Sequence, residues 1–322
     1  MQMRKAVDSR AALVMVGLCM TWSLQQVALK ASAADAAPVF QLALRSGVAA
    51  AMVLLYARIV ARDRWLKGGL LTPAVSVGSL FALEFLLVAQ GLNWTSASHM
   101  VVFLYTAPLF AALGLHLRLP DERLSRLQWS GMSLAFVGIA LAFLVPAMLE
   151  PEHGRVALWM LGDLLGLCGG VTWGMTTIAV RTSRMSEAPA TQTLFYQLSG
   201  AFVILLPAAI VLGQTRFHAS LVLWSSLAFQ TVFVCFGSFL IWFAMLRRYL
   251  ASRLSVLSFM TPLFGVLWGV ILLNERPSAA FALGAVLVCA GLIVVNGDTR
   301  IEPWLPRSWR RGQHSSTRTD HR

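Results

Sequence analysis

The stretch FLYTAPLFAALGLHLRLPDER, residues 103–123, recurs in outline as FMTPLFGVLWGVILLNER at residues 259–276. In both, a proline stands near the start of a long apolar run that closes on the pair Glu-Arg, and Pro108 and Pro262 are 154 residues apart. A long apolar run of this kind is typical of a membrane-spanning helix. Its return with the same proline and the same closing pair indicates that the chain is built from two related units.

The composition assigns the chain to the membrane proteins. Of its 322 residues, 57% are hydrophobic and only 12% are charged, which is too few to cover a globule of this size with a wettable surface. The apolar runs are about 20 residues long, and a helix of that length spans the roughly 30 Å hydrocarbon core. Because the runs are continuous rather than alternating, they disfavour strands and predict an all-α integral membrane protein. The ten predicted transmembrane helices are 11–30, 36–57, 71–92, 97–117, 127–147, 157–180, 189–212, 222–246, 252–273 and 278–296.

The 26 Lys and Arg residues are unevenly distributed between the two sides of this bundle. With the N-terminus inside, 21 of them fall at the inner ends, 4 fall outside and Arg45 falls within a span. Lys and Arg collect in cytoplasmic loops, so this distribution predicts that both termini are cytoplasmic. The net charge of +12 is therefore interpreted as a topology signal and not as a nucleic-acid interface.

The internal repeat extends over the whole helical part of the chain. At an offset of 151, Thr21 and Trp22 align with Thr172 and Trp173, and matches continue to the last span of each unit. Each unit has five predicted helices, and because five is odd the second unit must enter the bilayer from the opposite side. The predicted fold is therefore two inverted-topology five-helix repeats, which are typical of alternating-access transporters. The predicted segments are a cytoplasmic leader at 1–10, repeats at 11–149 and 156–297, and a basic, disordered cytoplasmic tail at 298–322.

Several long segments resemble a known family. TWSLQQVALK at 21–30, FQLALRSGVAAAMVLL at 40–55 and SRLSVLSFMTPLFGVLWGVILLNERPSAAFALGAVLVCAGLIVV at 252–295 are similar to the EamA family of the drug/metabolite transporter superfamily. The resemblance covers both repeats, from about residue 11 to 297. It implies ten helices with both ends in the cytoplasm, a bacterial inner-membrane location, and export of amino acids or related metabolites. It does not identify the cargo.

An acidic and a basic residue lie at similar predicted depth within the bilayer. Arg45 is 9 residues from the outer end of its span, and Glu84 is 8 residues from the outer end of the next one. In one interpretation they form a buried ion pair that only fixes packing. In the other, Glu84 faces the pathway, where it accepts a proton or meets the ammonium group of an amino-acid cargo, and Arg45 binds the carboxylate. The aligned residues of the second repeat are Ser238 and Leu198, so the charges belong to one half only.

The other predicted pathway residues are polar or aromatic groups at helical depth and the residues around the two prolines. A membrane helix bends or opens at proline, and paired interruptions in inverted repeats point to a substrate site, although proline can also be a mere packing bend. Polar side chains at this depth can equally serve as hydrogen-bonding glue between helices. The predicted pathway residues are Glu84, Arg45, Trp22, Gln26, Tyr105, Thr106, Pro108, Trp173, Gln197, Trp242, Met260 and Pro262, with Ser23, Gln25, Gln41, Gln90, Thr176, Thr177, Tyr196 and Thr261 as weaker candidates.

Glycine pairs and charged pairs recur at matched ends of the repeats. Gly131 and Gly138, like Gly284 and Gly291, are seven residues apart and share one helix face, so these stripes are predicted either to pack against each other or to form a homodimer seam. The charged pairs Glu122-Arg123 and Glu275-Arg276 are predicted to cap helix ends or to latch the bundle, and a gate is the alternative.

The sequence thus predicts a secondary transporter of a small-molecule substrate, an exporter with possible proton coupling. An importer, facilitator or exchanger remains an alternative because direction depends on gradients. No Walker A motif is present, so ATP is not expected as the direct energy source. No cofactor or metal site is expected, and no set of catalytic groups at one depth suggests an intramembrane enzyme. A non-transporting scaffold is the remaining alternative.

Overall fold

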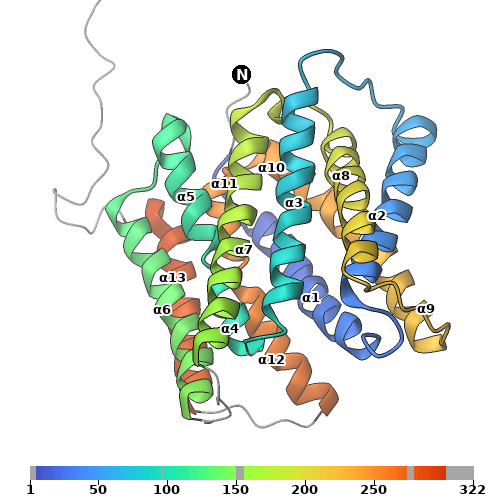
Figure 1. Ribbon diagram of the computed structural model, residues 1–322. Coiled ribbons are helices and arrows are strands. Elements are labelled where there is room, and N and C mark those ends of the chain that lie inside the picture. The colour runs from blue at the N-terminus through green and yellow to red at the C-terminus, as the bar shows by residue number, and fades with distance from the viewer. Residues whose placement is uncertain (1–4, 96, 150–155, 274–278, 302–322) are drawn as a thin grey trace, which may run out of the picture.

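The computed structural model describes residues 5–95, 97–149, 156–273 and 279–301, which form a bundle of helices (Figure 1). The predicted all-α membrane fold is confirmed. The first repeat contains α1 Ser9–Ala31, α2 Pro38–Leu55, α3 Leu71–Gly91, α4 Ala97–Leu104, α5 Ala107–Arg118 and α6 Arg126–Leu149. The second contains α7 Val156–Thr182, α8 Ala190–Val211, α9 Leu221–Ala228, α10 Phe239–Arg248, α11 Ala251–Leu257, α12 Met260–Leu273 and α13 Ala279–Ile301.

The fourth span of each repeat is broken beside its proline. The regular α-helix is interrupted by a two-residue turn at Tyr105 and Thr106 between α4 and α5, and by another at Ser258 and Phe259 between α11 and α12. Proline has no backbone N–H and cannot share the hydrogen-bonding of the preceding turn, so the break falls just before it. The expected opening at Pro108 and Pro262 is therefore present in both repeats, as a short turn in which Thr106 and Ser258 keep helix-like backbone angles.

Interruptions of a second kind were not predicted. The segments η1 Tyr56–Val60 and η4 Phe229–Ser238 are π-helical, so the span equivalent to α3 is made of α9, η4 and α10 in succession. Among the described residues, eight segments are long and apolar enough to cross a membrane, and Ala279–Val295 is a shorter apolar helix. The predicted span at 252–273 is divided into α11 and α12, and that at 278–296 corresponds to α13.

Helices pack in pairs that the duplication relates to one another. α2 packs against its own counterpart α8, and α6 packs against its counterpart α13. α4 and α5 lie on α7, while α11 and α12 lie on α1, which is the equivalent arrangement with the repeats exchanged. In Figure 1 the α6–α13 pair stands at one side of the bundle and the α2–α8 pair at the other.

Glycines at the α6–α13 contact reveal the relative direction of the two repeats. A Cβ at Gly131 would lie 2.9 Å from the carbonyl oxygen of Gly291, and one at Gly138 would lie 2.6 Å from that of Gly284. The lower number in one helix thus meets the higher number in the other, so the equivalent helices run antiparallel. The repeats are inverted as predicted. Of the two interpretations of these glycines, packing within one chain is the one observed.

We expect Gly138→Ala to destabilise the protein. The added methyl group would also lie 2.9 Å from the backbone nitrogen of Val288, and backbone can yield only if the two helices separate. Overpacking of this kind costs about 1–3 kcal/mol, which should lower the midpoint of thermal unfolding of the purified protein in detergent. The matched control is Gly17→Ala in α1, where no heavy atom lies within 4 Å of the added Cβ. Equal midpoints for the two variants would contradict the close approach of α6 and α13.

Candidate functional site

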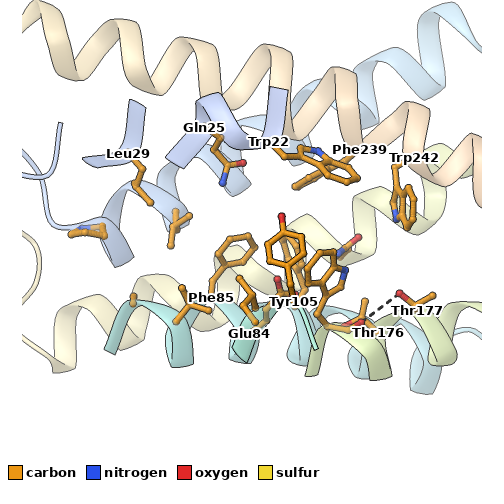
Figure 2. A pocket seen from close by; sticks show the side chains of 18 of the residues that line it. Trp22, Gln25, Leu29, Glu84, Phe85, Tyr105, Thr176, Thr177, Phe239 and Trp242 are labelled. Atoms are coloured by element: carbon orange, nitrogen blue, oxygen red, sulfur yellow. Dashed lines mark hydrogen bonds between the residues drawn. The ribbon is translucent and has the colours of Figure 1, made fainter. Parts of the chain in front are cut away.

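A cavity of about 510 Å³ lies between the two repeats. Its walls come from α1, α2, α3 and the α4–α5 break in the first repeat and from α7, α8 and α10 in the second. Figure 2 shows Trp22 and Gln25 of α1 on one wall, with Glu84 and Tyr105 on the opposite wall. Its volume is that of a site for one small molecule. The residues that carry its chemistry are Trp22, Gln25, Phe81, Glu84, Phe85, Tyr105, Trp173, Thr176, Thr177, Gln197, Phe239, Trp242 and Phe243.

The cavity is open at one end of the bundle and sealed at the other. Its lining includes Leu92, which is 46% exposed, and the exposed Asn93 in the turn after α3. At the opposite end the lining residues are Val180 and Leu246, which are 4% and 2% exposed. The mouth therefore lies where α3 ends, and the closed floor lies where α7 and α10 end.

Aromatic rings from matched helices form the walls. The rings of Trp22 and Trp242 meet edge to face with centroids 5.6 Å apart, and those of Tyr105 and Trp173 do so at 5.4 Å. The Trp22 indole is fixed further because its Nε1 donates a hydrogen bond of 2.9 Å to Ser238 Oγ. Such edge-to-face pairs hold their rings in defined orientations. The cavity is therefore a shaped aromatic box.

Glu84 is the one charged side chain among the described residues that line the cavity. It is 8% exposed, and no described residue donates a hydrogen bond to its carboxylate. Gln197 also lines the cavity, and its Oε1 is buried without a hydrogen-bond partner. Buried polar groups are normally paired, so unpaired ones facing a cavity indicate that a ligand completes them.

Arg45 does not take the part predicted for it. It forms no ion pair with Glu84 within 4.0 Å, and it is not among the residues that line the cavity. Its Nη1 donates a hydrogen bond of 3.0 Å to Gln230 Oε1, and its guanidinium lies 5.0 Å from the centre of the Phe85 ring. The predicted packing pair of Arg45 with Glu84 is therefore absent. Arg45 does reach α3, but there it meets the ring of Phe85 rather than Glu84, and its hydrogen bond goes to η4.

Arg45 is instead the inner end of a buried polar chain that sequence reasoning missed. Gln230 Nε2 donates to Ser226 Oγ at 2.9 Å and to Gln41 Oε1 at 3.3 Å. Gln41 in turn donates to the carbonyl oxygens of Ser32 and Ala36, which ties α1, α2 and η4 together. Arg45, which was predicted to pair with Glu84, is thus part of a hydrogen-bonded structural network. Spacing alone gave no signal for it, because its members come from three distant segments.

The remaining predicted residues divide into two groups. Trp22, Glu84, Tyr105, Trp173, Gln197 and Trp242 line the cavity, as do the weaker candidates Gln25, Thr176 and Thr177. The other weaker candidates are not lining residues: Ser23, Gln41, Gln90, Tyr196 and Thr261. Thr106, Pro108, Met260 and Pro262 are not lining residues; they form the breaks themselves, where the Thr106 hydroxyl donates 2.6 Å to the carbonyl of Phe103. The side chain of Gln26 lies outside the described residues. The phenylalanines of the wall were not predicted, since an apolar ring facing a cavity and one facing lipid are alike in sequence.

Beneath the closed floor, Glu122 joins the two repeats. This carboxylate is 1% exposed and accepts hydrogen bonds from Nε and Nη2 of Arg181 at the end of α7, the first at 3.0 Å. It also accepts from the backbone N–H groups of Ala251 and Ser252 at 3.1 Å, and from the Ser252 hydroxyl at 2.8 Å. Glu122 therefore caps α11 and anchors α7. We call Glu122, Arg181 and Ser252 the floor clamp.

Comparison with known proteins identifies the fold and the class of the cavity. The model of the EamA-like transporter family matches residues 9–144 and 160–297, one match for each repeat. The chain belongs to the EamA-like transporter family. It is therefore a membrane transporter and not an enzyme, and the cavity between its EamA repeats is the candidate transport site.

Named relatives of this EamA transporter are distant but nearly full length. An uncharacterized transporter of Synechocystis sp. is 26% identical, with 93% of this chain and 94% of the relative covered. A Salmonella typhimurium protein named "Probable amino-acid metabolite efflux pump" is 27% identical, with 89% and 94% covered. A solved crystal structure 21% identical superposes with a TM-score of 0.74 over 90% of this chain and 99% of that one, which shows a shared fold.

We expect Glu122→Gln to destabilise the protein strongly. It leaves the buried Arg181 guanidinium without its counter-charge, and breaking one side of a buried pair costs about 3–5 kcal/mol. The midpoint of thermal unfolding should fall well below that of the control Glu187→Gln, whose side chain is exposed. Combining Glu122→Gln with Arg181→Gln should recover part of the loss, because the stranded charge is removed. A double variant that is less stable than Glu122→Gln would refute this account of the floor clamp.

Proposed function

We propose that this EamA transporter is a secondary transporter of a bacterial inner membrane that exports amino acids or related small metabolites by alternating access. The observation that carries the proposal is the cavity at the interface of two inverted repeats, with a mouth at one end and the floor clamp at the other. Two similar units of opposite orientation can exchange conformations, so that the same site opens first to one side and then to the other. The direction and the class of cargo are supported by two relatives, each named "Probable amino-acid metabolite efflux pump".

The sidedness follows from the distribution of charge. The 21 Lys and Arg residues assigned to one side favour a cytoplasmic position for both termini and for the floor clamp. The mouth beside Asn93 then faces away from the cytoplasm, which makes this conformation the outward-open one. A cytoplasmic substrate would reach the site only after the floor clamp has parted.

We propose further that Glu84 couples transport to protons. A carboxylate within the membrane is costly unless a cation, a proton or water meets it, and such residues commonly mark coupling sites. Glu84 is the charge that faces the cavity among the described lining residues, and no described residue donates a hydrogen bond to its carboxylate. The proton and the cargo would therefore compete for the Glu84 carboxylate, which is what exchange of protons for cargo requires.

The proposed sidedness can be tested by labelling single cysteines with a membrane-impermeant maleimide. In a background in which the native cysteines at 19, 168, 235 and 289 are replaced by alanine, Asn93→Cys should react in intact cells. Glu187→Cys, in the exposed turn after α7, should react only after the cells are permeabilised. Reaction of both in intact cells would exclude opposite sides and with them the proposed orientation.

The proposed coupling predicts the behaviour of Glu84→Gln in proteoliposomes. With amino-acid substrates, an imposed pH gradient should accelerate flux through the unmodified protein. The same gradient should have no effect on the variant, because an amide does not bind a proton in this range. Counterflow without a gradient reports transport itself and should continue, at a reduced rate. A gradient response retained by Glu84→Gln would remove Glu84 from coupling, and absence of counterflow in the unmodified protein would overturn the transport proposal.

A further inference from the structure

The charge of the cavity has no counter-charge on the described part of its wall. Glu84 comes from the middle of α3, and the nearest candidate cation by depth, Arg45, donates instead to Gln230 and lies over the Phe85 ring. Phe85 belongs to the cavity lining, so it stands between this cation and the cargo space. Burying an unpaired carboxylate is unfavourable, and no described residue of the wall donates to Glu84, so a cationic ligand would stabilise it.

Two hydroxyls of the cavity wall do not donate into the cavity. The hydroxyls of Thr176 and Thr177 donate to the carbonyls of Thr172 and Trp173, which leaves their oxygens able only to accept. No described lining residue carries a positive charge. An ammonium group carries three donors and no acceptor, so it complements this set, whereas a carboxylate carries only acceptors.

One donor of the cavity wall, the indole N–H of Trp22, is already engaged. Trp22 faces Glu84 across the cavity, and its indole N–H is given to Ser238 on the second repeat. Trp22 presents its ring to the cavity, and Trp173, Trp242 and Tyr105 also line it with their rings. Aromatic faces attract cations and flat apolar groups, so the box adds to the recognition of an amine and adds nothing for a carboxylate.

We infer that the cargo is recognised as a primary amine with a flat apolar body, and that a carboxylate on the cargo is not a recognition element. This inference rests on the proposed function, because it concerns the cargo of the same cavity, and it extends the class of cargo from amino acids to primary amines with a flat apolar body. An aromatic α-amino acid would bind through its ammonium group and ring, but its carboxylate would be repelled by the carboxylate of Glu84. Amines that lack the carboxylate should be the better ligands.

The test is a matched set of four phenyl compounds titrated calorimetrically into the purified full-length protein. 2-Phenylethylamine has the amine alone, phenylalanine has the amine and the carboxylate, 3-phenylpropionate has the carboxylate alone, and 2-phenylethanol has neither. We expect 2-phenylethylamine to bind at least about tenfold more tightly than phenylalanine, because both offer the ammonium group but only phenylalanine must bury a carboxylate near Glu84 without a counter-charge. 3-Phenylpropionate should be the weakest.

The variant Glu84→Gln separates the charge from the shape of the cavity. It should lower the affinity for 2-phenylethylamine by at least about tenfold and leave that for 2-phenylethanol within about twofold, which also reports that the cavity is intact. The control Glu187→Gln should bind all four compounds as the unmodified protein does. Tighter binding of phenylalanine than of 2-phenylethylamine would overturn the inference, as would failure of 2-phenylethylamine to bind or an unchanged ranking in Glu84→Gln. Counterflow of amino acids in proteoliposomes that persists after any of these results would leave the proposed transport function standing.

Discussion

The antiparallel contact of α6 with α13 is the constraint on which the rest of the architecture depends. There the backbones approach so closely that the four glycines meet carbonyl oxygens of the opposite helix, with no side chain between them. A contact of this kind depends on van der Waals packing, which is what holds helices together where there is no water to expel. Because the two helices are equivalent by duplication, their contact also fixes the axis that relates the repeats. The cavity lies between the two units that this axis relates.

The aromatic box and the buried network show two ways of placing polar groups in such a bundle. Arg45 contacts protein groups only: its charge lies over Phe85, and its hydrogen bond continues through Gln230 to Gln41. Glu84 lines the cavity, and no residue in the described part of the chain donates a hydrogen bond to it. The first arrangement stabilises one conformation of α1, α2 and η4. The second leaves a group that a passing ligand can satisfy, which is the condition for reversible binding in a transporter.

The sequence predicted the periodic features well and the rotational ones poorly. Hydropathy, the odd number of helices and the paired prolines follow from distance along the chain, so the inverted repeats and the breaks before Pro108 and Pro262 could be predicted. Trp22, Trp173 and Glu84 could be found because amphipathic or charged groups are conspicuous in an apolar run. The direction of Arg45 could not, because depth does not fix the rotation of a helix about its axis. Phe81 and Phe239 line the cavity without any mark that distinguishes them from lipid-facing rings.

The duplication is visible in the backbone but has been lost at the centre of the cavity. The residue that corresponds to Glu84 is Ser238, which holds the Trp22 indole in place rather than facing a cargo. A chain made of two copies of the first unit would set a second acid beside Trp22, and one made of two copies of the second unit would have no acid at all. The single carboxylate therefore exists only because the halves have diverged. Each half has become specialised, so a chain made of two copies of either half would not reproduce a cavity with one carboxylate.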